Sequence, residues 1–435
     1  MAEPVSFEAL ASSQHVLSSA ENFVLYVLLE AVAQGRGGAG GGGSRLPLNL
    51  SVVIDRSGSM YDEQRLEYVV EAVKFLAGNL TPQDKVSIVA FADKAKVIVT
   101  PEEATNRDAV KRAIDDIDLL EIGGGTQMAL GMRAAIEEVN KNLDTSRLNR
   151  VLVLTDGQTY EETACIDLVQ QNRDKISFST MGVGVEFNEK LLQRLAQDSN
   201  GKYHFIGNPG DIPALFDDEL QGLRAVSVRS ARIEVTLAQG VQVRETFRAS
   251  PEIYAMGAPI IGDDRKISYE LGDLEAGVPG SVLLTLVLPP RKPGLVRMLQ
   301  SVLHYDVPGT GEGSANCDLA VEYTLDRTLT SKRNGRVMNL VDQVSIAKLQ
   351  AKAEEELKAG NVDRATRLLG NAIQGTQRMG NSKATQALAG LLDQVKKTQT
   401  LQTKAAKTTL LQAQAVVRKT QMLDPDALKD FGKPE

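Results

Sequence analysis

Residues 48–60 read LNLSVVIDRSGSM, an apolar run that ends at Asp55 and is followed by the hydroxyls of Ser57 and Ser59. The apolar run predicts a buried strand, which places the polar cluster at the carboxyl end of that strand. Short side-chain oxygens suit a hard divalent cation, because Mg²⁺ prefers near-octahedral oxygen coordination and keeps several of its waters. We therefore expect an incomplete metal site here, with one coordination position left for a visiting ligand.

Two further segments supply the remaining oxygens. Residues 122–127 read IGGGTQ, a glycine-rich loop in which Thr126 can approach an ion closely. Residues 151–157 read VLVLTDG, a second buried strand followed by an aspartate. Open α/β sheets gather their ligands at the carboxyl ends of the strands. The candidate metal ligands are therefore Asp55, Ser57, Ser59, Thr126 and Asp156.

This pattern, DxSxS followed by T and then D, resembles the metal-ion-dependent adhesion site of von Willebrand factor A domains, such as integrin I domains, over residues 46–223. The resemblance implies that Ser57, Ser59 and Thr126 bind the ion directly or nearly so, and that Asp55 and Asp156 bind it largely through water. An ion held in this way attracts an Asp or Glu of another protein. The resemblance implies binding rather than turnover, with Mg²⁺ as the expected cation and Mn²⁺ or Ca²⁺ as alternatives.

The same residue types also have an ordinary structural explanation. Asp and Ser after a strand are common turn and helix-capping residues, so Ser59 and Thr126 would cap helices and Asp156 would begin a turn. Some A domains keep the motif only as scaffold. Asp62 and Glu63 match the place of a second cation site in integrin β chains, although acids are also expected in the first turn of a helix.

Residues 46–224 alternate strand and helix signals, which predicts a doubly wound α/β domain with helices on both faces of a mostly parallel sheet. Residues 97–100 follow the strand at 86–91 so closely that the two should form a hairpin with an antiparallel edge. The expected strands are 48–54, 86–91, 97–100, 151–154, 176–183 and 202–206. The expected helices are 66–80, 108–117, 128–140, 188–197 and 212–223.

Residues 225–328 contain apolar runs of period two between Gly, Pro and Asp turns, which indicates an antiparallel β-sandwich. Residues 1–34 add two strand-like runs that are too few to be stable alone. We therefore expect these runs to complete the sandwich, so that the A domain is inserted into it, as in integrin β chains. Residues 35–45, GRGGAGGGGSR, are expected to be a flexible linker.

Residues 329–423 are expected to be helical, with helices at 337–359, 362–378 and 383–422 and a tail at 424–435. This region has sixteen Lys or Arg against six Asp or Glu, a net charge of +10, so the rest of the chain carries −17 of the total of −7. Such a charge is typical of a solvated helix face or of contact with an acidic partner. The lack of interleaved aromatic residues argues against nucleic acid as the partner.

Composition narrows the function further. The chain has only three histidines, without zinc-ligand spacing, and neither a Walker loop nor a nucleophile elbow, so we do not expect an enzyme. Cys165 and Cys317 are expected to be free thiols in a reducing compartment. Residues 23–33 are apolar but too short to span a membrane, and no basic leader precedes them, so the expected location is cytoplasmic.

The sequence thus predicts a metal-dependent protein–protein interaction module whose cation captures an acidic side chain of a partner. One alternative is an adaptor subunit for an AAA ATPase of the MoxR or chelatase type, which relatives of the A domain serve. Another is an RNA-associated A-domain protein that uses the basic helices.

Overall fold

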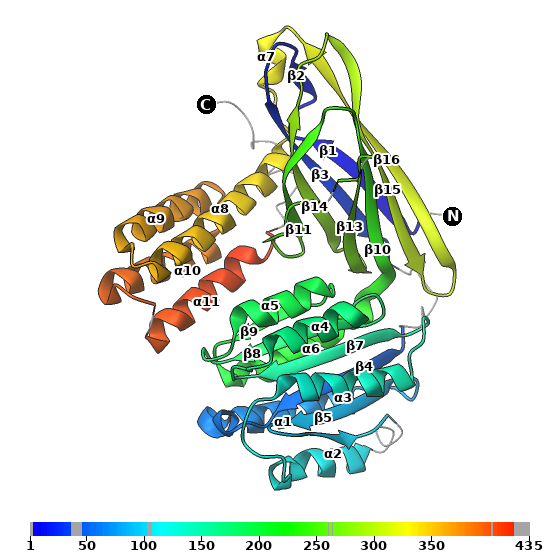
Figure 1. Ribbon diagram of the computed structural model, residues 1–435, viewed down its shortest axis with the longest axis vertical. Helices are drawn as coiled ribbons and strands as arrows, with labels where there is room; N and C mark the ends of the chain where they lie inside the picture. Colours follow the sequence, from blue (N-terminus) through cyan, green and yellow to red (C-terminus); the bar gives the residue numbers. More distant parts are fainter. Residues whose placement is uncertain are drawn as a thin grey trace. The chain divides into compact units, whose positions relative to one another are not determined.

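The computed structural model describes residues 3–35, 46–101, 107–259, 261–262, 264–401 and 403–421. The expected linker, apart from its first glycine, and the expected tail lie outside these residues. The chain divides into two compact units, residues 37–226 and residues 1–36 with 227–435 (Figure 1).

The first unit, called the α/β domain below, is built on a six-stranded sheet of order β6-β5-β4-β7-β8-β9. All neighbours pair in parallel except β6, which is antiparallel to β5, as the short connection between them predicted. The strands are β4 Leu48–Asp55, β5 Lys85–Phe91, β6 Ala95–Val99, β7 Leu148–Thr155, β8 Ser177–Val183 and β9 Tyr203–Ile206.

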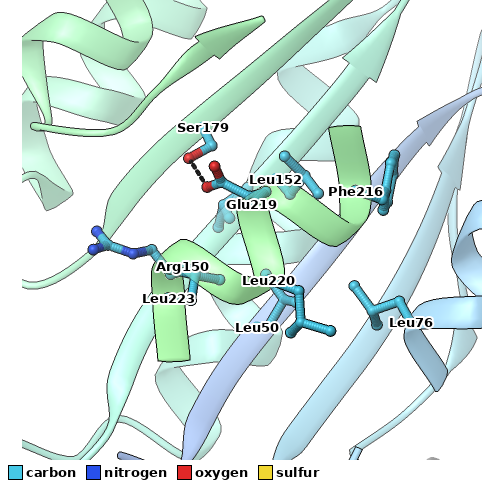
Figure 2. Close-up of a pocket in the computed structure, with 10 residues that line it drawn as sticks. Leu50, Leu76, Arg150, Leu152, Ser179, Phe216, Glu219, Leu220 and Leu223 are labelled. Atoms are coloured by element: carbon cyan, nitrogen blue, oxygen red, sulfur yellow. Dashed lines mark hydrogen bonds between the residues drawn. The ribbon is translucent and has the colours of Figure 1, made fainter. Parts of the chain in front are cut away.

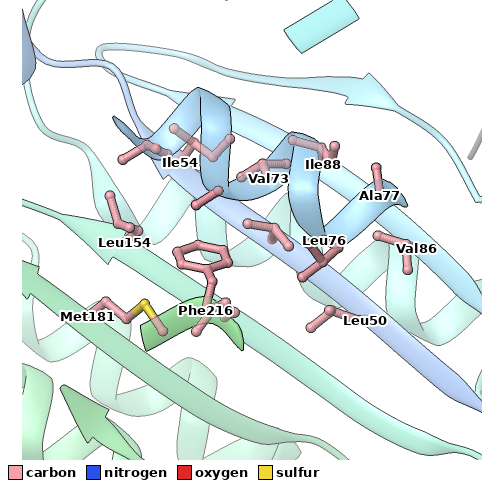
Figure 3. Packing of buried hydrophobic residues seen from close by; sticks show 14 of the residues in the cluster. Leu50, Ile54, Val73, Leu76, Ala77, Val86, Ile88, Leu154, Met181 and Phe216 are labelled. Carbon is pink, nitrogen blue, oxygen red and sulfur yellow. The ribbon is translucent and has the colours of Figure 1, made fainter. Parts of the chain in front are cut away.

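In the described part of this domain, six α-helices alternate with these strands. They are α1 Arg65–Gly78, α2 Arg107–Asp115, α3 Met128–Lys141, α4 Glu162–Asn172, α5 Glu189–Asp198 and α6 Ile212–Ala225. One core is formed by side chains of α1, α2 and α6 against the sheet, and Phe216 of α6 lies there among residues of β4, β7, β8 and α1 (Figure 3). The strand interiors are apolar on both faces because helices cover both, which confirms the doubly wound α/β fold.

The second unit contains two five-stranded sheets, of order β1-β3-β14-β11-β12 and β13-β10-β15-β16-β2. Apolar side chains from both sheets form one shared core, which makes this part a two-sheet domain. Its strands are β1 Val5–Ala11, β2 His15–Leu17, β3 Phe23–Ala33, β10 Val226–Leu237, β11 Gln242–Ser250, β12 Tyr254–Ala255, β13 Lys266–Glu275, β14 Pro279–Leu288, β15 Gly294–Val307 and β16 Gly311–Thr324.

The amino-terminal strands belong to both of these sheets. β3 pairs with β14 from Phe23 to Val32, and β1 forms the edge beside it, whereas β2 pairs in parallel with β16. The α/β domain is therefore inserted in the chain between strands of one mostly antiparallel two-sheet assembly, as the sequence predicted. The apolar residues 23–33 form a sheet strand, and no helix of the described residues is long and apolar enough to cross a membrane.

Among its described residues, the helical region contains the short α7 Arg327–Thr330 and four longer helices, α8 Gly335–Lys358, α9 Val362–Arg378, α10 Ser382–Thr398 and α11 Lys404–Arg418. α8 packs its first turns on the sheet that contains β3, β11 and β14. The expectation of one helix over residues 383–422 was wrong. Gln399 ends α10 in a left-handed conformation at φ 53°, and the Thr403 hydroxyl caps α11 by accepting from the Ala406 N–H at 3.2 Å.

Candidate metal site

The first loop of the site follows β4 and is held by Asp55, which is fully buried. One of its carboxylate oxygens accepts the backbone N–H of Ser57 at 2.8 Å, and the other accepts the hydroxyl of Thr155 at the end of β7. Burial raises the pKa of Asp55 to about 6, although hydrogen bonds from Thr155 and Ser57 lower it in part. Asp55 therefore fixes the loop and joins two neighbouring strand ends.

The two serines of this loop connect it to Asp156, which directly follows β7. The hydroxyl oxygens of Ser57 and Ser59 lie 3.2 Å apart, and Ser59 donates to Oδ1 of Asp156 at 2.7 Å. Asp156 is completely buried. The structure thus brings four of the five predicted ligands together by direct or shared hydrogen bonds.

Thr126 joins them through the glycine-rich loop. The Gly58 N–H donates to the Gly124 carbonyl at 3.1 Å, so this loop lies against the first. A Cβ placed on Gly157 would lie only 3.0 Å from the Thr126 hydroxyl oxygen, which puts Thr126 next to the turn that carries Asp156. Sequence reasoning missed Asp93, whose carboxylate accepts the Gly124 N–H at 3.0 Å. The Asp93 side chain also occupies the space that a side chain at Gly123 or Gly125 would need.

Helix capping does not explain these hydroxyls. The residue before α1 is Gln64 and the residue before α3 is Gln127, and neither accepts a capping hydrogen bond with its side chain. Ser57 precedes a 3₁₀ turn, Gly58–Gln64, without capping it through its side chain. The polar groups instead point to one another at the carboxyl edge of the sheet.

A buried arginine, also missed, completes the cluster. Nη1 of Arg65 lies 2.5 Å from Oδ2 of Asp156, and Nη2 lies 3.3 Å from Glu63. Burial lowers the pKa of Arg65, but the hydrogen bonds and charges of Asp156 and Glu63 outweigh it, so the net shift is upward and the guanidinium stays charged. Arg65 is a cation in the first turn of α1, where a positive charge is unfavourable beside the helix dipole. This unusual position is the signal by which the sequence could have pointed to Arg65.

The donor set fits a hard cation. Within the described part of the chain, no group of three His, Cys, Asp or Glu is arranged to bind a metal ion, so an ion at this edge would depend on hydroxyl oxygens. Three hydroxyls with two carboxylates suit Mg²⁺, which keeps part of its water shell, better than a soft metal.

A second buried polar cluster lies beside α6 in the same domain. Glu219 accepts the Ser179 hydroxyl at 2.6 Å (Figure 2). Its other carboxylate oxygen lies 3.2 Å from Nε2 of His204. Burial raises the pKa of Glu219, but the hydrogen bond and charge of His204, with Lys202 and Ser179, outweigh it and lower the pKa to about 2. This cluster attaches α6 to β8 and β9.

The basic residues of the helical region are partly neutralised by ion pairs within that region. Arg364 lies 3.0 Å from Glu356, and Lys397 lies 2.7 Å from Asp393. Lys348 pairs instead with a glutamate of the two-sheet domain, Glu245, at 2.8 Å. These pairs favour a solvated helix face that also contacts the neighbouring sheet.

Family comparisons agree with this geometry. Residues 49–218 match the model of the von Willebrand factor type A domain, and residues 335–419 match that of the Sll0103-like, C-terminal alpha-helical domain. The chain contains a von Willebrand factor type A (VWA) domain. VWA domains are commonly metal-dependent protein-interaction modules. The family assignment and the helical region agree with what the sequence predicted.

Two bacterial proteins are similar over much of the chain. The uncharacterized protein sll0103 of Synechocystis is 28% identical over 337 residues, which cover 76% of this chain and 79% of that protein. The uncharacterized protein YfbK of Escherichia coli is 24% identical over 256 residues, 58% of this chain but only 43% of YfbK.

Two solved structures share the fold over almost the whole chain. A von Willebrand factor type A protein from Catenulispora acidiphila gives a TM-score of 0.79 at 20% identity and covers 97% of both chains. The ArnB paralog VWA2 from Sulfolobus acidocaldarius gives 0.58 at 14% identity and covers 97% of this chain and 100% of its own. At these identities the likeness is one of fold.

Proposed function

We propose that the VWA domain binds a divalent cation, Mg²⁺ in the first place, through Ser57, Ser59 and Thr126 with Asp55 and Asp156, and so captures an acidic side chain of a partner protein. The observation that carries the proposal is the meeting of three hydroxyl side chains and two buried carboxylates from three separate loops at one edge of the sheet. The bound cation would supply a Lewis-acidic position for the partner's carboxylate.

Exposed apolar side chains around these loops support a protein as the ligand. Tyr61 follows the serine pair and is 50% exposed, and Tyr160, four residues after Asp156, is 99% exposed. Leu119 is 77% exposed. It follows Asp118, whose carbonyl accepts a hydrogen bond from the Arg56 side chain. Tyrosines are typical anchors of protein interfaces, so this surface suits an acidic residue flanked by apolar neighbours.

The cysteines bear on where this binding would take place. Cys165 is buried in α4 and Cys317 lies in β16, and both are free thiols, as expected. Unpaired cysteines in separate domains are typical of a reducing compartment. We therefore propose a cytoplasmic location for the interaction.

The test is a titration of the full chain with Mn²⁺, followed by electron paramagnetic resonance. Ser57→Ala and Thr126→Ala should each lower the affinity by about tenfold or more. Ser51→Ala is the matched control, because Ser51 is a buried serine of β4, the strand before Ser57, and accepts the Ser87 hydroxyl at 2.8 Å. This variant should bind Mn²⁺ like the wild type. Equal affinities for all four proteins would overturn the metal site, and partner recovery unchanged by EDTA would overturn the capture of an acidic side chain.

A further inference from the structure

We propose that Arg65 holds a fixed positive charge in the wall of the metal site, so that the site binds a divalent cation weakly by itself and tightly only together with an incoming carboxylate. This inference rests on the proposed function, since it concerns the same cation and the same acidic ligand. It assigns Arg65 the role of a positioning residue that couples the two binding events.

The burial of the pair shows that the charge is fixed. The side chain of Arg65 is 6% exposed and that of Asp156 is not exposed at all, with Nη1 and Oδ2 2.5 Å apart. Separating such a pair would leave a buried carboxylate without a counter-charge, which is strongly unfavourable. The guanidinium therefore stays on Asp156 while the other carboxylate oxygen accepts from Ser59.

The backbone is shaped to put Arg65 at this point. Glu63 and Gln64, directly before it, both have left-handed conformations, at φ 54° and 59°, which are uncommon for residues other than glycine. Such conformations concentrate at functional sites. Room for the guanidinium comes from Gly184, where a Cβ would lie 3.3 Å from Nη2 and where φ is +77°.

The charge count of the site explains the expected coupling. Among the five predicted ligands and Arg65, Asp55 and Asp156 contribute two negative charges, Arg65 contributes one positive charge and the three hydroxyls contribute none, which leaves −1 against a dication. Glu63 is about half exposed, so water screens most of its charge. The N-terminal end of α1 adds further positive potential. A partner's carboxylate supplies the charge that this site lacks.

The size of the effect follows from the strength of such contacts. A charge within about 4–6 Å changes the pKa of a carboxylate by about 1–3 units, which corresponds to about 10- to 1000-fold in an equilibrium constant. Removal of the Arg65 charge should therefore raise the affinity for a divalent cation by at least about tenfold.

The experiment measures Mn²⁺ affinity of the full-length wild type, Arg65→Gln and Arg65→Lys, with and without saturating acetate. Without acetate, Arg65→Gln should bind Mn²⁺ at least about tenfold more tightly than the wild type, whereas Arg65→Lys, which keeps the charge, should bind like the wild type. Acetate should tighten Mn²⁺ binding more in the wild type than in Arg65→Gln. Circular dichroism checks that each variant folds, and Arg65→Met, of similar length, replaces the Gln variant if that one does not.

Each outcome decides the inference. The role of Arg65 is overturned if the uncharged variant binds Mn²⁺ no more tightly than the wild type. It is also overturned if acetate tightens Mn²⁺ binding by the wild type no more than by that variant. If both uncharged variants fail to fold, the wild type alone decides, since acetate must tighten its Mn²⁺ binding. Failure of every protein to bind Mn²⁺ with or without acetate instead overturns the proposed function, so the two failures are distinguishable.

Discussion

Replacing Glu219 with glutamine should loosen α6 from the sheet of the VWA domain. Glutamine keeps the size of the side chain and can still accept the Ser179 hydroxyl, but it removes the negative charge beside His204. The pKa of Glu219 is about 2 in the folded protein, against about 4.3 for an ordinary glutamate. The difference of about 2.3 units corresponds to about 3 kcal/mol of stability.

The direction of the Glu219 pKa shift determines the pH range in which its contribution to stability can be measured. The folded-state pKa lies below the unfolded value, so the contribution is fully present above about pH 4.3 and is lost as the pH falls through about 2. At about pH 5 the Glu219 carboxylate is ionised, so its contribution to stability is present in full. The difference between the wild type and Glu219→Gln should be largest there and should shrink in more acidic solution.

Hydrogen exchange of the full chain is the suitable assay, because a protein of several domains does not unfold in one step. Amides of α6, residues 212–225, should exchange about two orders of magnitude faster in Glu219→Gln than in the wild type at about pH 5, as expected for about 3 kcal/mol. Asp218→Asn is the control, because Asp218 is an exposed acid of the same helix. If the two variants exchange alike, the Glu219 carboxylate does not stabilise α6 and the reasoning is refuted.

Three smaller predictions follow from single contacts. Gly157→Ala should weaken Mn²⁺ binding, measured by paramagnetic resonance, because its Cβ would lie 3.0 Å from the Thr126 hydroxyl oxygen. An unchanged affinity would contradict the role of Thr126 as a metal ligand. Asn334→Ala should destabilise the start of α8 by about 1 kcal/mol in hydrogen exchange, since Asn334 caps that helix, and unchanged protection would contradict this. Burial raises the pKa of Cys165 to about 12, so a maleimide should modify Cys317 well before Cys165 in the folded protein, and the reverse order in mass spectrometry would count against the structure.

Sequence patterns assigned the candidate ligands to three loops that the structure brings together, because Asp55 and Asp156 follow apolar strands and Thr126 follows a glycine run. Ser59 and Asp156 are 97 residues apart in the chain, yet their oxygen atoms lie 2.7 Å apart, as expected for neighbouring strands of one parallel sheet. Their role as metal ligands stays a prediction. The period of two likewise predicted strands of the two-sheet domain such as β13 and β16, in which buried residues alternate with exposed ones.

The residues that were missed depend on contacts that no local pattern specifies. Arg65 reaches Asp156 only because Glu63 and Gln64 take left-handed conformations, and neither residue type favours them. Asp93 supports the glycine loop from a different strand end. The break between α10 and α11 at Gln399 has no glycine or proline to mark it, so the helical period ran through it.

The pairing of β3 with β14 has a consequence for synthesis of the chain. Val32 pairs with Pro279, 247 residues later, so β3 leaves the ribosome long before its partner. At about 5–20 residues per second, the strand waits roughly 12–50 seconds while the inserted VWA domain is made and can already fold. During that time the segment FVLYVLLEAVA exposes apolar side chains and unpaired backbone groups, the features that promote aggregation. A chaperone that shields this nascent strand should therefore increase the yield of folded protein.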